Sequence, residues 1–178
     1  MKTWTDISLS KYCRYVLGRT IQAVYVPFEE LGHDAKVLPK HPDRLFYSDK
    51  ALPRCAIWHE CGHLKILESP SAVASMPLPT TIAFAEGFGY SYLHPMPENE
   101  KSILDTIQFE ERVEHERRAQ AWAIQEASRR RLVGVLRELL NMMLDYNWDD
   151  YPVYREAKRR LATDFEVLLQ THPVAKSS

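Results

Sequence analysis

Residues 59–63, with the sequence His-Glu-Cys-Gly-His, form an H-E-x-x-H motif, which can hold a metal ion and activate water. His59 and His63 are four positions apart, so on a helix both imidazoles project from one face and can bind the same zinc ion. Glu60 lies beside them and can act as the general base toward water. A catalytic zinc site needs three protein ligands and one open position. The third ligand must therefore come from another residue.

Glu116 is one candidate for that third ligand. Ala119 and Ala123 follow it at i+3 and i+7. On a helix these alanines share the face of Glu116, and their small size leaves room for the metal-binding helix to approach closely.

Glu86 and Cys55 are the other two candidates. Glu86 lies in a strongly apolar stretch, residues 80–93, where a buried carboxylate without a partner is costly and a metal ion would supply that partner. Cys55 precedes His59 by one helical turn. One straight helix rarely wraps three ligands around a metal, which argues against Cys55.

Secondary-structure signals around the motif predict an α+β fold, with a small sheet first and helices afterwards. Residues 20–26 and 44–48 are rich in β-branched and aromatic side chains and predict strands, with a short extended piece near Val37. Ser48 or Asp49 is placed to cap a helix over about residues 50–67, which carries the motif and has Pro53 in its first turn. Apolar residues at three- and four-residue steps predict one long helix or two abutting helices over residues 98–146, and a last helix over 153–170.

Length, net charge and cysteine content limit the kinds of protein that this chain can be. The chain has 178 residues, which suits one domain, here residues 1–170 with a disordered tail over 171–178. The net charge of −1 gives no overall attraction to nucleic acid or membrane, and the basic clusters at 129–131 and 158–160 are interpreted as solvated helix faces.

No apolar run is long enough to span a bilayer, and residues 1–10 lack the apolar core of a signal peptide. Three cysteines without a C-x-x-C pair are typical of free thiols in a reducing cytoplasm.

The motif and the segment around Glu116 together resemble the ImmA/IrrE-type metallopeptidases of bacteria and their phages. Members have a short antiparallel sheet, an H-E-x-x-H helix and a later helix with an E-x-x-A-x-x-W-A-like segment, whose Glu is the third zinc ligand. The matching positions here are His59, Glu60, His63, Glu116, Ala119, Trp122 and Ala123. The strand RLFYS and the run ALPR at 51–54 also fit, so the resemblance covers about residues 20–124.

This chain departs from the family in one respect. Glu116 follows His63 by 53 positions, a longer gap than is usual, so about half of it would be an insertion. Glu86 follows His63 by 23 positions, and the segment E-G-F-G resembles the one that supplies the third ligand in a wider group of Glu-zincins. Glu116 matches over the longer segment, and Glu86 has the more usual spacing.

The resemblance implies a zincin-like zinc metallopeptidase in which Zn²⁺ is bound by His59, His63 and a downstream Glu, with Glu60 as the general base. It also implies a regulatory role, the cleavage of a specific protein such as a transcriptional repressor, with no membrane or nucleic-acid partner expected. The alternative from another class is a binding module on the same scaffold, which holds a protein or DNA without cutting. A third is a different zinc hydrolase built on the same helix motif.

Overall fold

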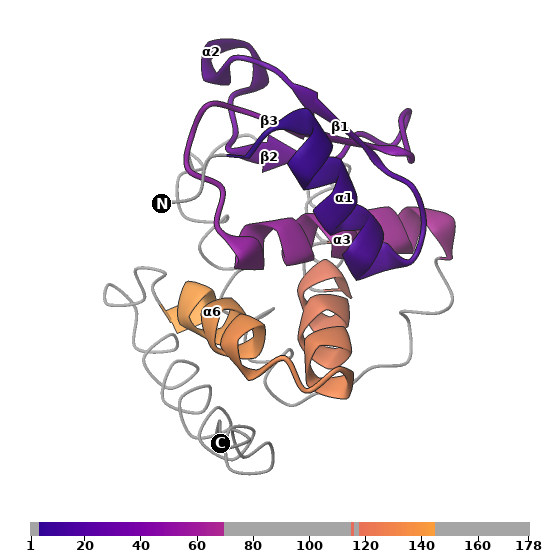
Figure 1. The fold of residues 1–178 in the computed structure, drawn as a ribbon, viewed down its shortest axis with the longest axis vertical. Helices are drawn as coiled ribbons and strands as arrows, with labels where there is room; N and C mark the ends of the chain where they lie inside the picture. Colours follow the sequence, from indigo (N-terminus) through magenta and orange to yellow (C-terminus); the bar gives the residue numbers. More distant parts are fainter. Residues whose placement is uncertain (1–3, 70–114, 116–117, 145–178) are drawn as a thin grey trace, which may run out of the picture. The chain divides into compact units, whose positions relative to one another are not determined.

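The structure is a computed structural model that describes residues 4–69, 115 and 118–144. The chain divides into two compact units, Met1–Ser75 and Met76–Ser178, and each is considered separately. The single domain over 1–170 stays a prediction, and the predicted last helix and tail lie outside the described residues. The first unit holds the following elements in order: α1 (Asp6–Leu17), β1 (Gln22–Tyr25), α2 (Phe28–Leu31), β2 (Ala35–Lys36), β3 (Arg44–Tyr47) and α3 (Arg54–Glu68) (Figure 1).

The first helix, α1, is absent from the elements predicted above, although its ends carry clear signals. Thr5 and Ser8 form a capping box, in which the Ser8 amide donates to the Thr5 hydroxyl (3.2 Å) and the Thr5 amide donates to the Ser8 hydroxyl (2.9 Å). Gly18 ends the helix with a φ of 74°, a conformation that glycine adopts without a Cβ penalty. Between these ends, the residues at helical spacing are buried: Leu9, Cys13 and Val16.

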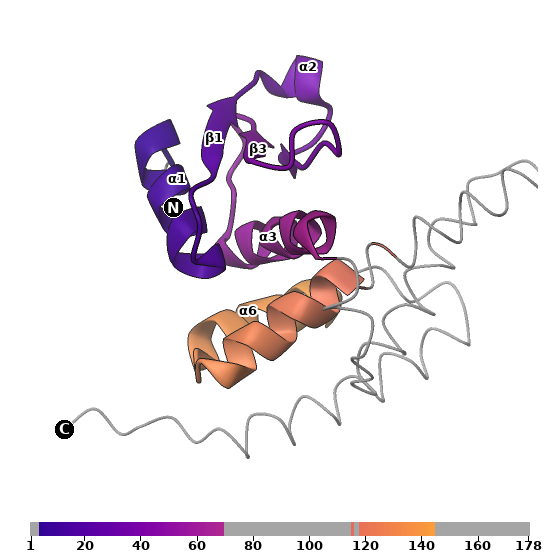
Figure 2. The ribbon, with the colours of Figure 1, turned by 90° about the vertical axis from the view of Figure 1, so that its right-hand side faces the viewer.

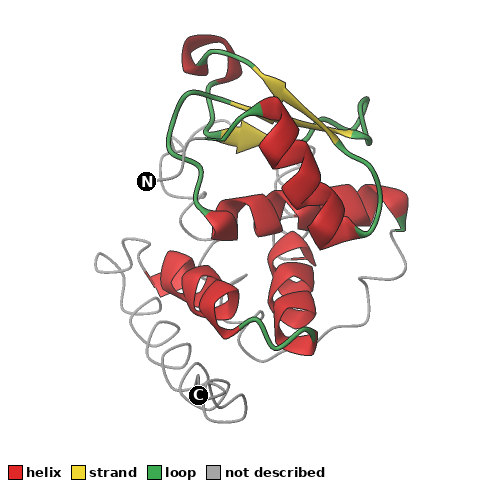
Figure 3. Cartoon of the chain, viewed as in Figure 1, coloured by secondary structure: helices red, strands yellow, loops and turns green. Residues whose placement is uncertain are grey.

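The sheet has three strands in the order β1–β3–β2 and is mixed (Figure 3). The strands predicted over 20–26 and 44–48 are confirmed as β1 and β3, but these two pair in parallel, so the expectation of an antiparallel sheet is wrong for them. Residues 26–43 contain α2 and β2, and this long connection allows the chain to cross over and return in the same direction. Only the short β2 pairs antiparallel with β3.

The core of the first unit is built around α1 and α3. α1 contacts both β1 and α3, and α3 contacts β2 (Figure 2). The Trp58 indole donates to the Tyr12 hydroxyl at 3.1 Å, which joins the two helices. Fully burying a large apolar side chain stabilises a fold by about 1.5–3 kcal/mol. The buried side chains from these elements include Leu9, Cys13, Val16, Ala23, Leu45, Trp58 and Cys61.

The helix that carries the motif, α3, starts later than predicted. It begins at Arg54, with Pro53 at the N-cap and no side chain capping it, instead of near residue 50. The two predicted caps are engaged elsewhere. Ser48 donates to the carbonyl of Asp34 (3.3 Å), and Asp49 accepts from the amide of Phe28 (3.3 Å). Proline lacks a backbone N–H, and this costs little at the N-cap, because the N–H groups at a helix start have no partner within the helix.

The described part of the second unit consists of two helices. Residues 118–129 form the first, α6 (Val133–Leu144) forms the second, and Arg131 between them has a φ of 54°. Within residues 118–144, the described part of the region predicted as one long helix or two abutting helices, the chain forms two helices, and the rest of that prediction lies outside the described residues. The buried amide of Gln120 donates to the carbonyl of Leu139 at 3.4 Å and links them. Among the described residues, no helix has the length and apolar character needed to cross a membrane.

The basic cluster at residues 129–131 lies at the end of the first of these helices. Glu126 accepts from both Arg129 (2.6 and 2.8 Å) and Arg130 (2.6 Å). The hydrogen bond from Arg129 is the main reason that the pKa of Glu126 lies below its usual value. Two of the three arginines are therefore paired with a carboxylate. The interpretation of the cluster as a solvated helix face, and not a nucleic-acid surface, stays a prediction.

Candidate metal centre

The H-E-x-x-H residues lie on α3, as predicted, and their side chains come together. The Nε2 atoms of His59 and His63 are 3.1 Å apart, and the two rings are nearly perpendicular, at 87°, with centroids 4.7 Å apart. Each of His59, Glu60 and His63 offers one ligand atom, and all three atoms lie within 4.8 Å of one another. In the described part of the chain, these three residues form the only such cluster of histidine, cysteine and acidic side chains.

The spacing of the two imidazoles fits a metal ion. Zinc binds histidine nitrogen at about 2.0–2.1 Å with tetrahedral geometry, which places two nitrogen ligands about 3.3 Å apart. The observed separation of 3.1 Å between the Nε2 atoms is close to that value. Two nitrogen donors beside one carboxylate are also a donor set that zinc accepts readily. The cluster can therefore hold a metal ion, with the carboxylate within reach of it.

Burial differs among the three side chains. His63 is buried, with 7% of its surface exposed, whereas His59 and Glu60 are intermediate. Partly exposed groups beside a buried one are compatible with a catalytic zinc site, because such a site needs an open position that admits water and substrate. A closed structural zinc site would instead surround the ion with four protein ligands.

The local sequence of α3 explains how the helix places His59 and His63 on one face. His59 and His63 are one turn apart, and Gly62 between them is buried. Glycine costs about 1 kcal/mol relative to alanine inside a helix, so its presence here favours a helix that another part of the protein approaches closely.

The residue between the motif's ends, Cys61, belongs to the core and not to the metal cluster. Burial raises the pKa of the Cys61 thiol well above its ordinary value, and the neighbouring Cys13 thiol of α1 adds to the increase. Cys55, a candidate third ligand, is buried on the same helix and is not part of the cluster. Both thiols of α3 are thus buried and lie outside the metal cluster.

The other two candidate ligands, Glu116 and Glu86, lie outside the described residues. The downstream positions that match the family segment are described. Ala119, Trp122 and Ala123 all lie in the helix over residues 118–129, and all three are buried. The helical context expected for the segment is thus present just after residue 116.

One residue near the site was not anticipated from the motif. Arg19 follows the glycine that ends α1, and its side chain reaches the last turn of α3, where it donates to the carbonyl of Leu64 at 3.4 Å. The available signal was weak, because a glycine followed by an arginine marks a helix end without showing what the arginine will contact.

Comparisons of this chain with protein-family models, with curated proteins and with solved structures found no match. The cluster on α3 and the chemistry of its side chains are therefore the features that indicate a function.

Proposed function

We propose that this protein is a zinc-dependent metallo-endopeptidase. The observation that carries the proposal is the pair of Nε2 atoms, 3.1 Å apart, with the carboxylate of Glu60 in the same cluster. Two neutral imidazoles suit zinc, and a carboxylate that neighbours them suits proton transfer. The resemblance of the motif and of the segment around Ala119 and Trp122 to the ImmA/IrrE-type metallopeptidases agrees with this choice.

Each residue has a defined role in the proposed reaction. His59 and His63 hold the zinc ion, which when bound lowers the pKa of water and polarises the peptide carbonyl. Glu60 takes a proton from the attacking water, whose oxygen forms a bond to the carbonyl carbon. As the carbon–nitrogen bond breaks, Glu60 passes that proton to the leaving amine, and the remaining proton of the water leaves the new carboxyl group, so that the products at neutral pH are a carboxylate and an ammonium group.

The third zinc ligand in this proposal is Glu116 or, alternatively, Glu86. Metal content of purified protein, measured by elemental analysis, distinguishes them. We expect about one zinc ion per chain in the unchanged protein. We also expect its loss in only one of the variants Glu116→Ala and Glu86→Ala. If none of the proteins takes up zinc, even after zinc is added back, the peptidase proposal is wrong.

The role of Glu60 can be tested separately from metal binding. Glu60→Gln removes the base but leaves both histidines, so we expect the variant to retain zinc and to lose activity by at least about 100-fold, the lower range for general base catalysis. Glu30→Gln, which changes an exposed carboxylate on α2, serves as the matched control and should be fully active. If the variant keeps the biological function of the protein, the alternative is favoured, a binding module that acts by holding its partner; peptidase activity that survives would instead show that Glu60 is not the base.

The proposed substrate is a specific protein, such as a transcriptional repressor, in the cytoplasm. The three cysteines are present as thiols and are buried, which agrees with a reducing compartment. Mass spectrometry of new protein N-termini, in cells that contain the unchanged protein or Glu60→Gln, tests this expectation. One or a few cleavage sites that depend on Glu60 would support a narrow substrate range. Widespread cleavage would contradict it.

A further inference from the structure

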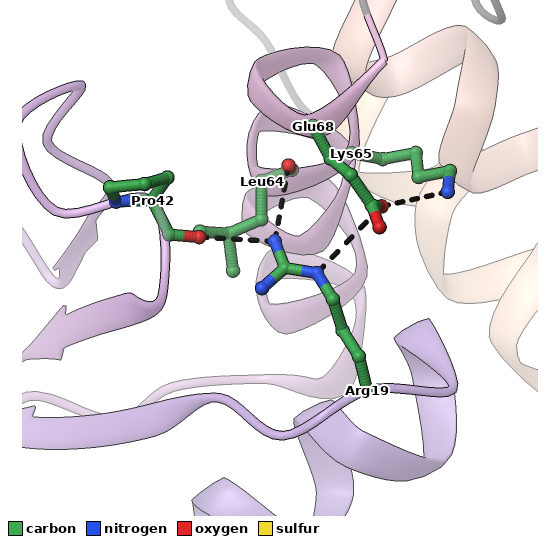
Figure 4. Close-up of polar contacts among 5 residues, drawn as sticks. All are labelled: Arg19, Pro42, Leu64, Lys65 and Glu68. Atoms are coloured by element: carbon green, nitrogen blue, oxygen red, sulfur yellow. Dashed lines mark hydrogen bonds and ion pairs between the residues drawn. The ribbon is translucent and has the colours of Figure 1, made fainter.

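The side chain of Arg19 joins three segments of the first unit at the C-terminal end of α3 (Figure 4). Its Nη2 atom donates to the carbonyl of Pro42 at 3.0 Å and to the carbonyl of Leu64 at 3.4 Å. Its Nε atom lies 3.7 Å from a carboxylate oxygen of Glu68. Pro42 lies just before β3, so one guanidinium connects the end of α1, the entry to the sheet and the last turns of the metal-binding helix.

The contact with α3 is at a point where a cation is favourable. The carbonyl groups in the last turns of a helix carry partial negative charge, which attracts a nearby cation. Lys65 also donates to Glu68, at 2.8 Å. This bond is the main reason that the pKa of Glu68 lies below its usual value, and the charge of Arg19 contributes to the same shift. The end of α3 is thus held by one arginine and one lysine that share a carboxylate.

The contact between Arg19 and the carbonyl of Leu64 lies next to the metal cluster in the chain. Leu64, whose carbonyl accepts from Arg19, directly follows His63. Helix ends fray, and the turn after His63 is the last turn of α3, which ends at Glu68. Fraying that reached residue 63 would move its imidazole away from that of His59 and change the 3.1 Å separation of their Nε2 atoms.

We infer that Arg19 is a positioning residue for the metal centre, which fixes the C-terminal turns of α3 and thereby keeps His63 aligned with His59. This inference rests on the proposed function only in requiring that the cluster binds a metal ion. In this inference Arg19 acts through the backbone at Leu64, whose carbonyl accepts from its guanidinium.

Cobalt(II) titration of the full-length protein tests the inference, because cobalt occupies zinc sites and its visible absorption reports the ligand geometry. We expect Arg19→Gln to weaken cobalt binding roughly three- to tenfold, below the 10–100-fold typical of groups bonded directly to a metal ligand. We also expect a changed absorption spectrum. Arg19→Lys, which keeps the positive charge at the helix end, should restore part of the affinity. Arg14→Gln is the matched control, since Arg14 is an exposed arginine in the last turn of the same helix, α1.

The measurements are made well below the midpoint of thermal unfolding of each variant, so that a loss of folded protein does not count as a loss of affinity. If Arg19→Gln binds cobalt with the affinity and spectrum of the unchanged protein, and only its thermal midpoint is lower, then Arg19 is merely structural and the inference is wrong. If the unchanged protein itself binds neither cobalt nor zinc, the proposed function fails and the inference fails with it. If the unchanged protein binds the metal and Arg19→Gln binds it equally well, only the inference about Arg19 fails and the proposed function stands.

Discussion

At the scale of single residues, Cys61 lies within the H-E-x-x-H motif, but its side chain belongs to the core and not to the metal cluster. Cys61 is fully buried, and burial holds its pKa well above the ordinary value, so at neutral pH it is protonated. The thiolate is the reactive form, and Cys13 and Cys55 are buried as well. We expect the folded protein to react with Ellman's reagent much more slowly than a free thiol. In denaturant all three cysteines should react at once. Rapid labelling of even one thiol in the native protein would contradict this burial.

Tyr47 gives a prediction for alkaline pH. Burial and the hydrogen bond that its hydroxyl donates to Asp6 (2.7 Å) raise its pKa from 10.0 to about 12. Because the folded state favours the protonated phenol, the stabilisation is fully present below pH 10 and is lost as the pH rises toward 12. By linkage, the free energy of unfolding should fall by about 1 kcal/mol between pH 9 and pH 11. Urea unfolding at several pH values measures this fall.

The matched variants for this measurement are Tyr47→Phe and Tyr25→Phe. Tyr47→Phe removes the ionisable group, so its stability should vary less over the same pH range than that of the unchanged protein. Tyr25 is 49% exposed and makes the smallest contribution to the raised pKa of Tyr47, so its replacement should change the pH dependence only slightly. An equal slope in all three proteins would mean that Tyr47 is not the group responsible.

The site residues on α3 could be predicted because one local rule governs them. Spacing of four on a helix brings two side chains together whatever the rest of the fold does, so the cluster of His59, Glu60 and His63 follows from a few adjacent letters. Arg19 could not be predicted in this way. Its contact with Leu64 spans 45 positions and depends on how α1 packs against α3, which no local pattern encodes.

At the scale of elements, the end of α1 offers a test of backbone conformation. Gly18 has a φ of 74°, and a Cβ added there would meet no atom within 4 Å. Gly18→Ala should therefore cost only the strain of the left-handed backbone, about 1 kcal/mol. For a protein of this size such a loss lowers the thermal midpoint by about 2–4 °C, measurable by calorimetry. Gly18→Asn, which tolerates this conformation better, should lose less, and equal losses would show that the backbone conformation is not the cause.

The strands and the motif helix were predictable as elements, but their arrangement was not. Composition identified β1 and β3, yet strand composition says nothing about pairing direction. The parallel pairing follows from the α2 and β2 segments that separate the two strands. The start of α3 was misplaced because Ser48 and Asp49 are good capping residues that bond to other segments here. Helix α1 was missed although both its capping box and its apolar residues at helical spacing are visible in the sequence.

At the scale of the whole molecule, the metal ion should contribute to stability if the cluster binds it. A ligand that binds only the folded state, present at about 100 times its dissociation constant, adds about 2.7 kcal/mol. With a shift of about 2–4 °C per kcal/mol for a chain of this length, zinc should raise the thermal midpoint by about 5–11 °C, and a strong chelator should reverse the rise. Calorimetry of the apo- and zinc-loaded protein measures the difference.

The variant His63→Ala makes this test specific to the cluster. It removes the buried member of the histidine pair, so zinc should no longer raise the midpoint, whereas Arg14→Gln should respond as the unchanged protein does. Zinc also binds to histidine and cysteine side chains in unfolded chains, which reduces the stabilisation and can even reverse its sign in the variant. A rise of the same size in His63→Ala would place the zinc elsewhere on the molecule, and α3 would then carry two histidines whose proximity serves packing alone.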